Sequence, residues 1–119
     1  MKIAITSQGT HLDSLVDPRF GRAAYILIVD TDTFDFEVLD NKENVNAFKG
    51  AGIQAASMVN DKGAEVLLTG YCGPKAFQIL NAAKINVADN VEGTVRDAVA
   101  SFKEGKLTFA DKANAEAQW

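Results

Sequence analysis

The chain has 119 residues, of which 47% are hydrophobic and 24% charged, a length and composition that fit one globular domain with its own core. A single cysteine excludes an internal disulfide, a zinc ribbon and an iron–sulfur cluster held by several thiolates of this chain. The formal net charge of −4 argues against non-specific nucleic-acid binding, and an anionic ligand would need a local positive field.

The first third of the chain predicts three strands and one long loop. Residues 3–6 and the apolar run 25–30 are typical of buried strands, and residues 34–40 begin with the alternation of a half-buried strand. The polar loop 7–22 separates the first two strands, whereas a short turn joins the second to the third. We therefore expect an antiparallel meander.

The rest of the chain predicts helices that alternate with strands. The expected helices cover residues 53–62, 75–83 and 95–102, and the expected strands cover residues 65–69 and 85–88. Gly63 suits the position after a helix end, Pro74 suits the first helical position, and Thr94 with Asp97 is similar to a capping box. From Lys106 the periodicity fades, so we expect a domain over residues 1–109 and a loosely held tail over residues 110–119.

This order of elements predicts one α/β domain with a five-stranded mixed sheet and about three helices. Crossover helices require the later strands to run parallel. If the fourth strand pairs beside the first, the sheet order is 3-2-1-4-5, with strand 2 antiparallel. The loops after strands 1, 3, 4 and 5 then emerge at one sheet edge, where open α/β sheets bind their ligands.

The turn formed by residues 70–75 is the most informative segment for function. Its glycines let the backbone approach a ligand, and the helix that follows offers unpaired N–H groups and a partial positive charge for an anion. Lys75 adds a full charge. Cys72 could have a lowered pKa there and bind a soft metal, or it could be a small buried residue without a role. The candidate ligand-binding residues of this turn are Gly70, Tyr71, Cys72, Gly73 and Lys75.

Two other segments of the same predicted edge hold candidate residues. In the long loop, Arg19 and Arg22 flank Phe20 and Gly21; arginine suits diffuse anions, although these arginines could instead pair with nearby carboxylates and pin the loop. His11 is either a surface histidine or a ligand. Before the first predicted helix, Gly50 and Gly52 give a weak nucleotide signal, because neither common phosphate-loop motif occurs.

Several of these segments, in this order, resemble the dinitrogenase iron–molybdenum cofactor family from residue 1 to about residue 109. Each motif alone is weak, and their shared order makes the resemblance specific. The matching segments are residues 12–14, 16–23, 50–53, 69–70, 73–74 and 93–95, followed by Phe102 and Gly105.

The resemblance implies an RNase H-like fold without nuclease activity, and a protein that is not an enzyme. It implies non-covalent carrying of an anionic metal–sulfur cluster, either a molybdenum–copper sulfide or an iron–molybdenum–sulfur cluster, whose own sulfides complete the metal shells. Arg19, Arg22, Lys75, backbone N–H groups and the apolar Phe20 and Tyr71 would hold it, with direct ligation by Cys72 or His11 as an alternative. Its partners would be proteins that donate or accept the cluster.

Two other functions fit parts of the sequence. An RNase H-like nuclease needs clustered carboxylates for Mg²⁺, and the first predicted strand has no central acid. A regulatory module could bind a small molecule or a protein at the same edge. No apolar run approaches the roughly 18 residues of a membrane span, and no signal-like segment opens the chain, so we expect a cytoplasmic protein.

Overall fold

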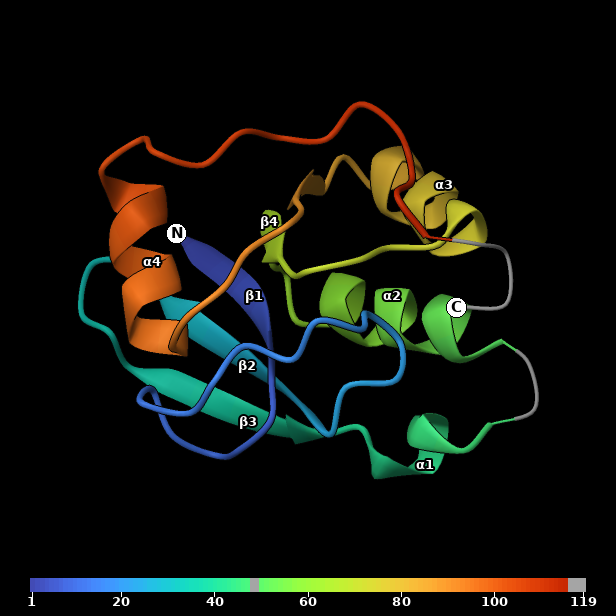
Figure 1. The fold of residues 1–119 in the computed structure, drawn as a ribbon, viewed down its shortest axis with the longest axis horizontal. Helices are drawn as coiled ribbons and strands as arrows, with labels where there is room; N and C mark the ends of the chain where they lie inside the picture. The colour runs from blue at the N-terminus through green and yellow to red at the C-terminus, as the bar shows by residue number, and fades with distance from the viewer. Residues whose placement is uncertain (48–49, 116–119) are drawn as a thin grey trace.

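One mixed sheet lies at the centre of the molecule (Figure 1). The structure is a computed structural model, and it describes residues 1–47 and 50–115. The strand order β3-β2-β1-β4-β5 confirms the prediction, with β2 antiparallel to β1 and β3, and β4 parallel to β1 and β5. The strands are β1 (Lys2–Ser7), β2 (Tyr25–Asp30), β3 (Phe36–Asp40), β4 (Val66–Leu68) and β5 (Asn86–Ala88). The helices over the described residues are α1 (Lys42–Val45), α2 (Ala51–Asp61), α3 (Pro74–Ala82) and α4 (Val95–Lys103).

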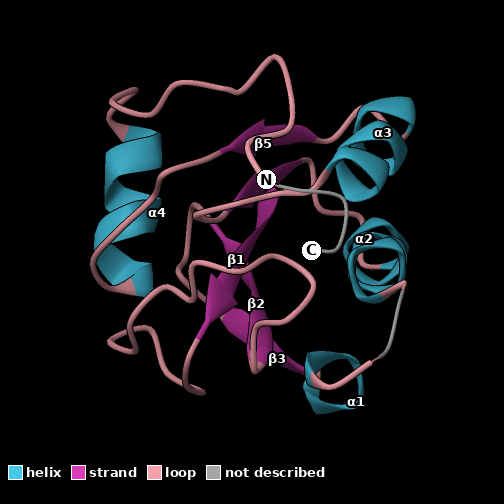
Figure 2. Cartoon of the chain, turned by 45° about the vertical axis from the view of Figure 1, so that its right-hand side comes forward, coloured by secondary structure: helices cyan, strands magenta, loops and turns pink. Residues whose placement is uncertain are grey.

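The two faces of the sheet bury separate hydrophobic clusters, because side chains alternate along each strand. Ala4, Ile26 and Leu67 point to the face covered by α2 and α3, whereas Ile5 and Leu27 point to the face covered by α4. Figure 2 shows α4 alone on one side of the sheet and the other helices on the opposite side. The core is therefore built from three layers, with the sheet in the middle.

Two local expectations fail at β3 and after it. β3 is mostly exposed rather than half-buried, with Phe36 40% and Val38 37% exposed. It is an edge strand, and the single helix on that face, α4, packs on β1 instead. The polar stretch after β3 also contains the short helix α1, which its turn-rich composition does not predict.

The C-terminal segment is held to the rest of the fold at several residues, which differs from the loosely held tail expected over residues 110–119. Phe109 pairs with Ala88 of β5, and the Ala110 N–H donates to the Val87 carbonyl at 2.7 Å. Such irregular chain has no hydrophobic period, so its anchoring leaves no pattern in the sequence. The end of the predicted tail, residues 116–119, lies outside the described residues.

None of the helices in the described ranges is long and apolar enough to cross a membrane.

Candidate functional site

The long loop after β1 and the turn after β4 lie side by side. Arg19 forms a parallel bridge with Tyr71. The Phe20 N–H donates to the Tyr71 carbonyl at 3.0 Å, and the Tyr71 N–H donates to the Pro18 carbonyl at 2.6 Å. A Cβ atom on Gly70 would lie 2.7 Å from the Pro18 backbone, so this approach requires glycine. Two segments that are 50 residues apart in sequence thus form one surface.

The same loop also packs on the first turn of α2. Gly21 has φ of +98°, and a Cβ atom there would lie 2.8 Å from the backbone nitrogen of Gly52. A side chain at position 21 is therefore excluded twice, by the left-handed backbone and by the neighbouring helix. The structure accordingly brings together the three glycine-containing segments that the sequence places at one edge.

Polar side chains hold this loop in place from the β3–α2 connection. The buried Asn41 donates through Nδ2 to the carbonyl oxygens of Gly21 and Ala23, at 3.0 and 2.8 Å. Arg22 donates through Nη1 to the Val45 carbonyl at 3.1 Å. Arg22 also donates through Nη1 to the Ala47 carbonyl at 2.9 Å, so its side chain braces the loop against this connection. Asn41 was not predicted from the sequence, because its only signal is a polar residue directly after a strand.

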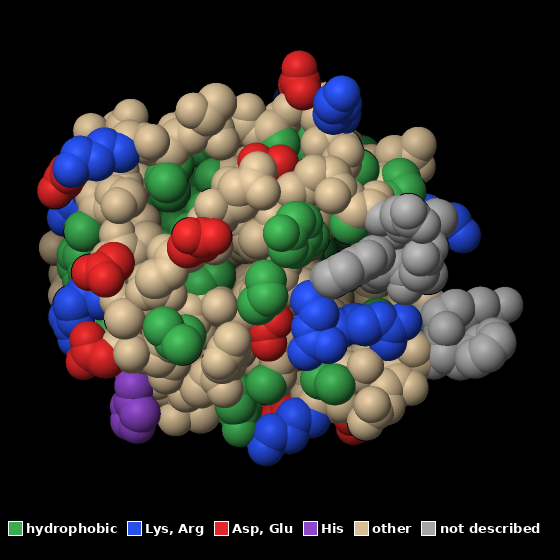
Figure 3. All heavy atoms as spheres, viewed as in Figure 1, with side chains coloured by type: hydrophobic (Ala, Val, Ile, Leu, Met, Phe, Trp, Pro, Cys, Tyr) green, Lys and Arg blue, Asp and Glu red, His purple; other side chains and the backbone are tan. Residues whose placement is uncertain are grey.

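Two cationic side chains belong to these segments. The Arg19 side chain is 47% exposed, and its Nε lies 3.7 Å from Oδ1 of the buried Asp17, which also accepts the Arg19 N–H at 3.0 Å. This contact orients Arg19 but is too long for a strong hydrogen bond. Lys75 is exposed in the first turn of α3. Figure 3 shows Lys and Arg side chains gathered over the loop and beside α2.

The helices α2 and α3 both begin at this surface with a glycine N-cap. Gly50 and Gly73 have no side chain to accept the orphan N–H groups of the first turn. The partial positive charges of two helix ends therefore add to those of Arg19 and Lys75. Together they form a local positive field in an acidic chain, which suits an anion.

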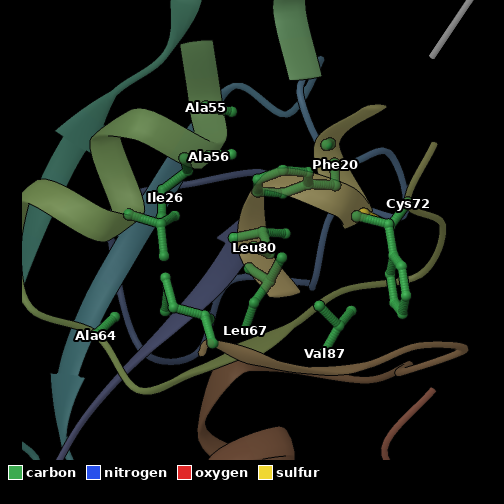
Figure 4. Packing of buried hydrophobic residues seen from close by; sticks show 14 of the residues in the cluster. Phe20, Ile26, Ala55, Ala56, Ala64, Leu67, Cys72, Leu80 and Val87 are labelled. Carbon is green, nitrogen blue, oxygen red and sulfur yellow. The ribbon is translucent and has the colours of Figure 1, made fainter. Parts of the chain in front are cut away.

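Cys72 does not offer a thiolate to this surface. Its side chain is buried, and burial, helped by the charge of Asp89, raises the pKa of the Cys72 thiol to about 12. The thiol thus stays protonated at neutral pH, and the lowered pKa considered from the sequence is wrong. Figure 4 shows Cys72 among the apolar side chains of the α2–α3 face.

Phe20 belongs to the same apolar cluster and is fully buried. The predicted contact of its ring with a surface ligand is therefore wrong for this structure, because core packing takes the ring inward (Figure 4). The exposed apolar side chains on the joined segments are instead Tyr71, at 43%, and Ile53 in the first turn of α2, at 41%. Ile53 was not among the residues predicted from the sequence, although it directly follows the candidate residue Gly52.

His11 lies in the other half of the loop, on the side of α4. That half is held by a bridge between Leu15 and Thr94 and by an ion pair of 2.9 Å between Arg96 Nε and Asp13 Oδ1. The structure does not bring His11 to the segments described above; its side chain is purple in Figure 3. Within the described ranges, no three side chains of His, Cys, Asp or Glu could hold a metal ion together.

These donors fit an anion that carries its own sulfide ligands. The surface offers a guanidinium, an ammonium, backbone N–H groups and exposed apolar side chains, while the nearby thiol is neutral and buried. Arginine and apolar groups favour weakly hydrated, diffuse anions over small, strongly hydrated ones.

The chain is similar in sequence and in fold to several known proteins. A family model described as dinitrogenase iron-molybdenum cofactor matches residues 1–105. The apo form of the orange protein from Desulfovibrio gigas is 50% identical, with a TM-score of 0.93 over 96% of both chains. A candidate NifB protein of the DUF35 family from Thermotoga is 35% identical, with a TM-score of 0.83 over 96% of this chain and 97% of its own. An uncharacterized protein of Methanocaldococcus jannaschii is 27% identical over 90% of this chain and 89% of its own.

Proposed function

The chain belongs to the dinitrogenase iron-molybdenum cofactor family, and from this membership we propose that it binds and carries an anionic metal–sulfur cluster. The cargo is a molybdenum–copper sulfide cluster or an iron–molybdenum–sulfur cluster. The proposed role requires no bond of a substrate to be made or broken, so the protein acts as a carrier rather than an enzyme. Proteins that supply or take up the cluster are its expected partners, in the cytoplasm.

The observation that carries this proposal is the close backbone approach of three segments. Gly21 lies against Gly52, and Gly70 lies against Pro18, so the loop holds the starts of α2 and α3 on one surface. Each helix start alone is a common feature of α/β folds. Two of them beside exposed cationic side chains give a field that a polyanion can use.

Different groups of the proposed site supply charge, hydrogen bonds and apolar contacts. Arg19 and Lys75 supply full charges, and Arg22 adds charge from the position that the Val45 carbonyl fixes. No side chain of the described residues accepts the backbone N–H groups at these two helix starts, so these groups donate to the sulfides of the cargo. Tyr71 and Ile53 cover its less polar surface.

The test is metal retention by the apo protein. We expect the protein mixed with tetrathiomolybdate and Cu(I) to keep both metals and a visible chromophore after desalting. Arg19→Ala and Lys75→Ala should each weaken retention roughly five- to tenfold, the range for one partly exposed charge-assisted contact.

Arg96→Ala is the matched control, because it removes an exposed arginine at the start of α4. It should retain metal as the wild-type protein does. Loss of both metals from the wild-type protein on desalting would contradict the proposal, and so would an equal loss in the Arg96 variant.

A further inference from the structure

The C-terminal segment that follows α4 crosses the molecule and reaches the candidate site. We call residues 107–114 the strap. In Figure 1 the strap is the red segment that leaves α4 and passes the end of β5 toward α3. Leu107 packs against the cluster on the α4 face, and Ala110 and Ala113 pack against the cluster on the other face. The strap therefore joins the two outer layers of the fold.

Asn114 attaches the strap to the turn after β4 by three hydrogen bonds. Its Oδ1 accepts the Cys72 N–H at 2.8 Å, its Nδ2 donates to the Gly70 carbonyl at 3.0 Å, and its backbone N–H donates to the Cys72 carbonyl at 3.1 Å. One residue thus satisfies both backbone groups of Cys72. The opposite side of the same turn is held by the loop, through Pro18 and Phe20.

We propose that Asn114 is a positioning residue of the cluster site and that the strap is a cover that opens as a unit over Cys72. This inference rests on the proposed function for its effect on the cargo. Its effect on Cys72 stands on the structure of the strap alone.

The strap has the properties of a segment that opens before the rest of the fold. Its large side chain, Phe109, is 44% exposed, and its other apolar contacts come from alanines and one partly buried leucine. Single backbone bonds, such as that of Ala110 to Val87, hold it along β5. Segments with few buried contacts open locally at a lower free energy than the core.

Opening of the strap changes the site, because the turn leads directly into α3. Without Asn114, the Cys72 N–H loses its acceptor, and the Gly70 carbonyl loses one of two donors while it keeps the Asn90 N–H. The Cys72 end of the turn, which leads into α3, is then held less firmly. By linkage, a cargo that binds more tightly when the turn is held by Asn114 also stabilises the closed strap.

The first experiment measures reaction of the single cysteine with a thiol reagent in the metal-free protein. Asn114→Ala should raise the labelling rate of Cys72 about tenfold, since several hydrogen bonds of the closed strap are lost. Asn81→Ala, which removes an exposed asparagine of α3, is the matched control and should label as the wild-type protein does. Equal labelling rates of Cys72 in Asn114→Ala and in the wild-type protein would overturn the proposal that the strap covers Cys72.

The second experiment measures opening of the strap in the wild-type protein by amide hydrogen exchange. The amides of Cys72, Ala110 and Asn114 all depend on the closed strap, so after correction for intrinsic rates they should exchange with one common protection. The amides of Phe20 and Tyr71, held by the loop, should be protected at least tenfold more. Protection of Cys72 equal to that of Phe20 would contradict a separately opening strap.

The closing experiment repeats the exchange after loading with tetrathiomolybdate and Cu(I). Slower exchange of the Cys72 and Asn114 amides in the loaded protein, and weaker metal retention in Asn114→Ala than in Asn81→Ala, would support Asn114 as a positioning residue. Retained metal with unchanged exchange would overturn the positioning role and leave the carrier function standing. Failure to retain metal would overturn the carrier function. The cysteine labelling and the amide exchange of the metal-free protein would still decide whether the strap opens over Cys72.

Discussion

The start of α4 differs from the starts of α2 and α3, although all three helices begin at the same edge of the sheet. At α4, Thr94 Oγ1 accepts the Asp97 N–H at 3.1 Å. The carbonyls of Ser14 and Leu12 accept the N–H groups of the two preceding residues, Val95 and Arg96, at 2.9 and 2.7 Å. At α2 and α3 the N-caps are glycines, and no side chain of the described residues caps either helix.

This difference shows how one loop produces two kinds of helix start. Its first half brings carbonyl oxygens to α4, so the donors there are satisfied by the protein itself. Its second half approaches α2 and the turn before α3 at Gly21 and Gly70 and brings Arg19 to the surface, and its Pro18 carbonyl accepts the Tyr71 N–H of the turn rather than an N–H of a helix start. An anion is therefore favoured at the second surface and has no vacant donors at the first.

The largest expected effect comes from closing the approach at α2. Gly21→Ala places a methyl group against Gly52 and forces alanine into a left-handed backbone, which should lower the free energy of unfolding by roughly 2–4 kcal/mol. Gly63→Ala is the matched control, because Gly63 has φ of +74° and open space around its Cα. Its loss should be about 1 kcal/mol. Denaturant unfolding measures the free energy of unfolding of both variants. An equal decrease in the two variants would show that Gly21 does not pack closely against Gly52.

An intermediate effect is expected at the start of α4, where the protein itself supplies acceptors for the first N–H groups. Thr94→Ala removes the N-cap acceptor of α4 and should lower the free energy of unfolding by about 1 kcal/mol. Metal retention should stay at the wild-type level, because this end of α4 takes no part in the proposed site. A variant that folds but loses the metals would contradict the division between the two kinds of helix start.

The smallest effect concerns the exposed pair that fixes the α4 half of the loop. The hydrogen bond and charge of Arg96 hold the pKa of Asp13 below its ordinary value of 3.8. Because the folded-state pKa is lowered, this pair stabilises the fold above about pH 3.8, and the contribution is lost as the pH falls through the lowered pKa. The difference in stability between the wild-type protein and Asp13→Asn should therefore shrink in acid. Thermal unfolding at neutral and acidic pH measures it, and a constant difference would rule out the linkage.

The arrangement of the sheet followed from rules that act on whole elements. A meander followed by helix crossovers leaves few ways to place β4, and the order β3-β2-β1-β4-β5 is the one found. The shared edge of the loops then follows from strand direction. The glycines of the 70–75 turn were predicted to let the backbone approach a ligand, and at Gly70 the structure places the Pro18 backbone there instead.

The side chains at the edge were less predictable, because their placement depends on contacts across the fold. Phe20 and Cys72 turn inward to fill the space between α2, α3 and the sheet. The two halves of one loop lie on opposite faces, which separates His11 from Arg19. Asn114 contacts Cys72 of the turn across 42 residues of sequence, and no periodic pattern indicates this contact.

A map of amide chemical shifts, recorded as tetrathiomolybdate and Cu(I) are added to the apo protein, shows which helix starts the anion contacts. We expect the largest changes at Gly21, at Gly52 in the first turn of α2 and at Ala76 in the first turn of α3. We expect small changes at Arg96 in the first turn of α4. Changes centred on Arg96 and His11, with the α2 and α3 starts unmoved, would contradict the proposed site.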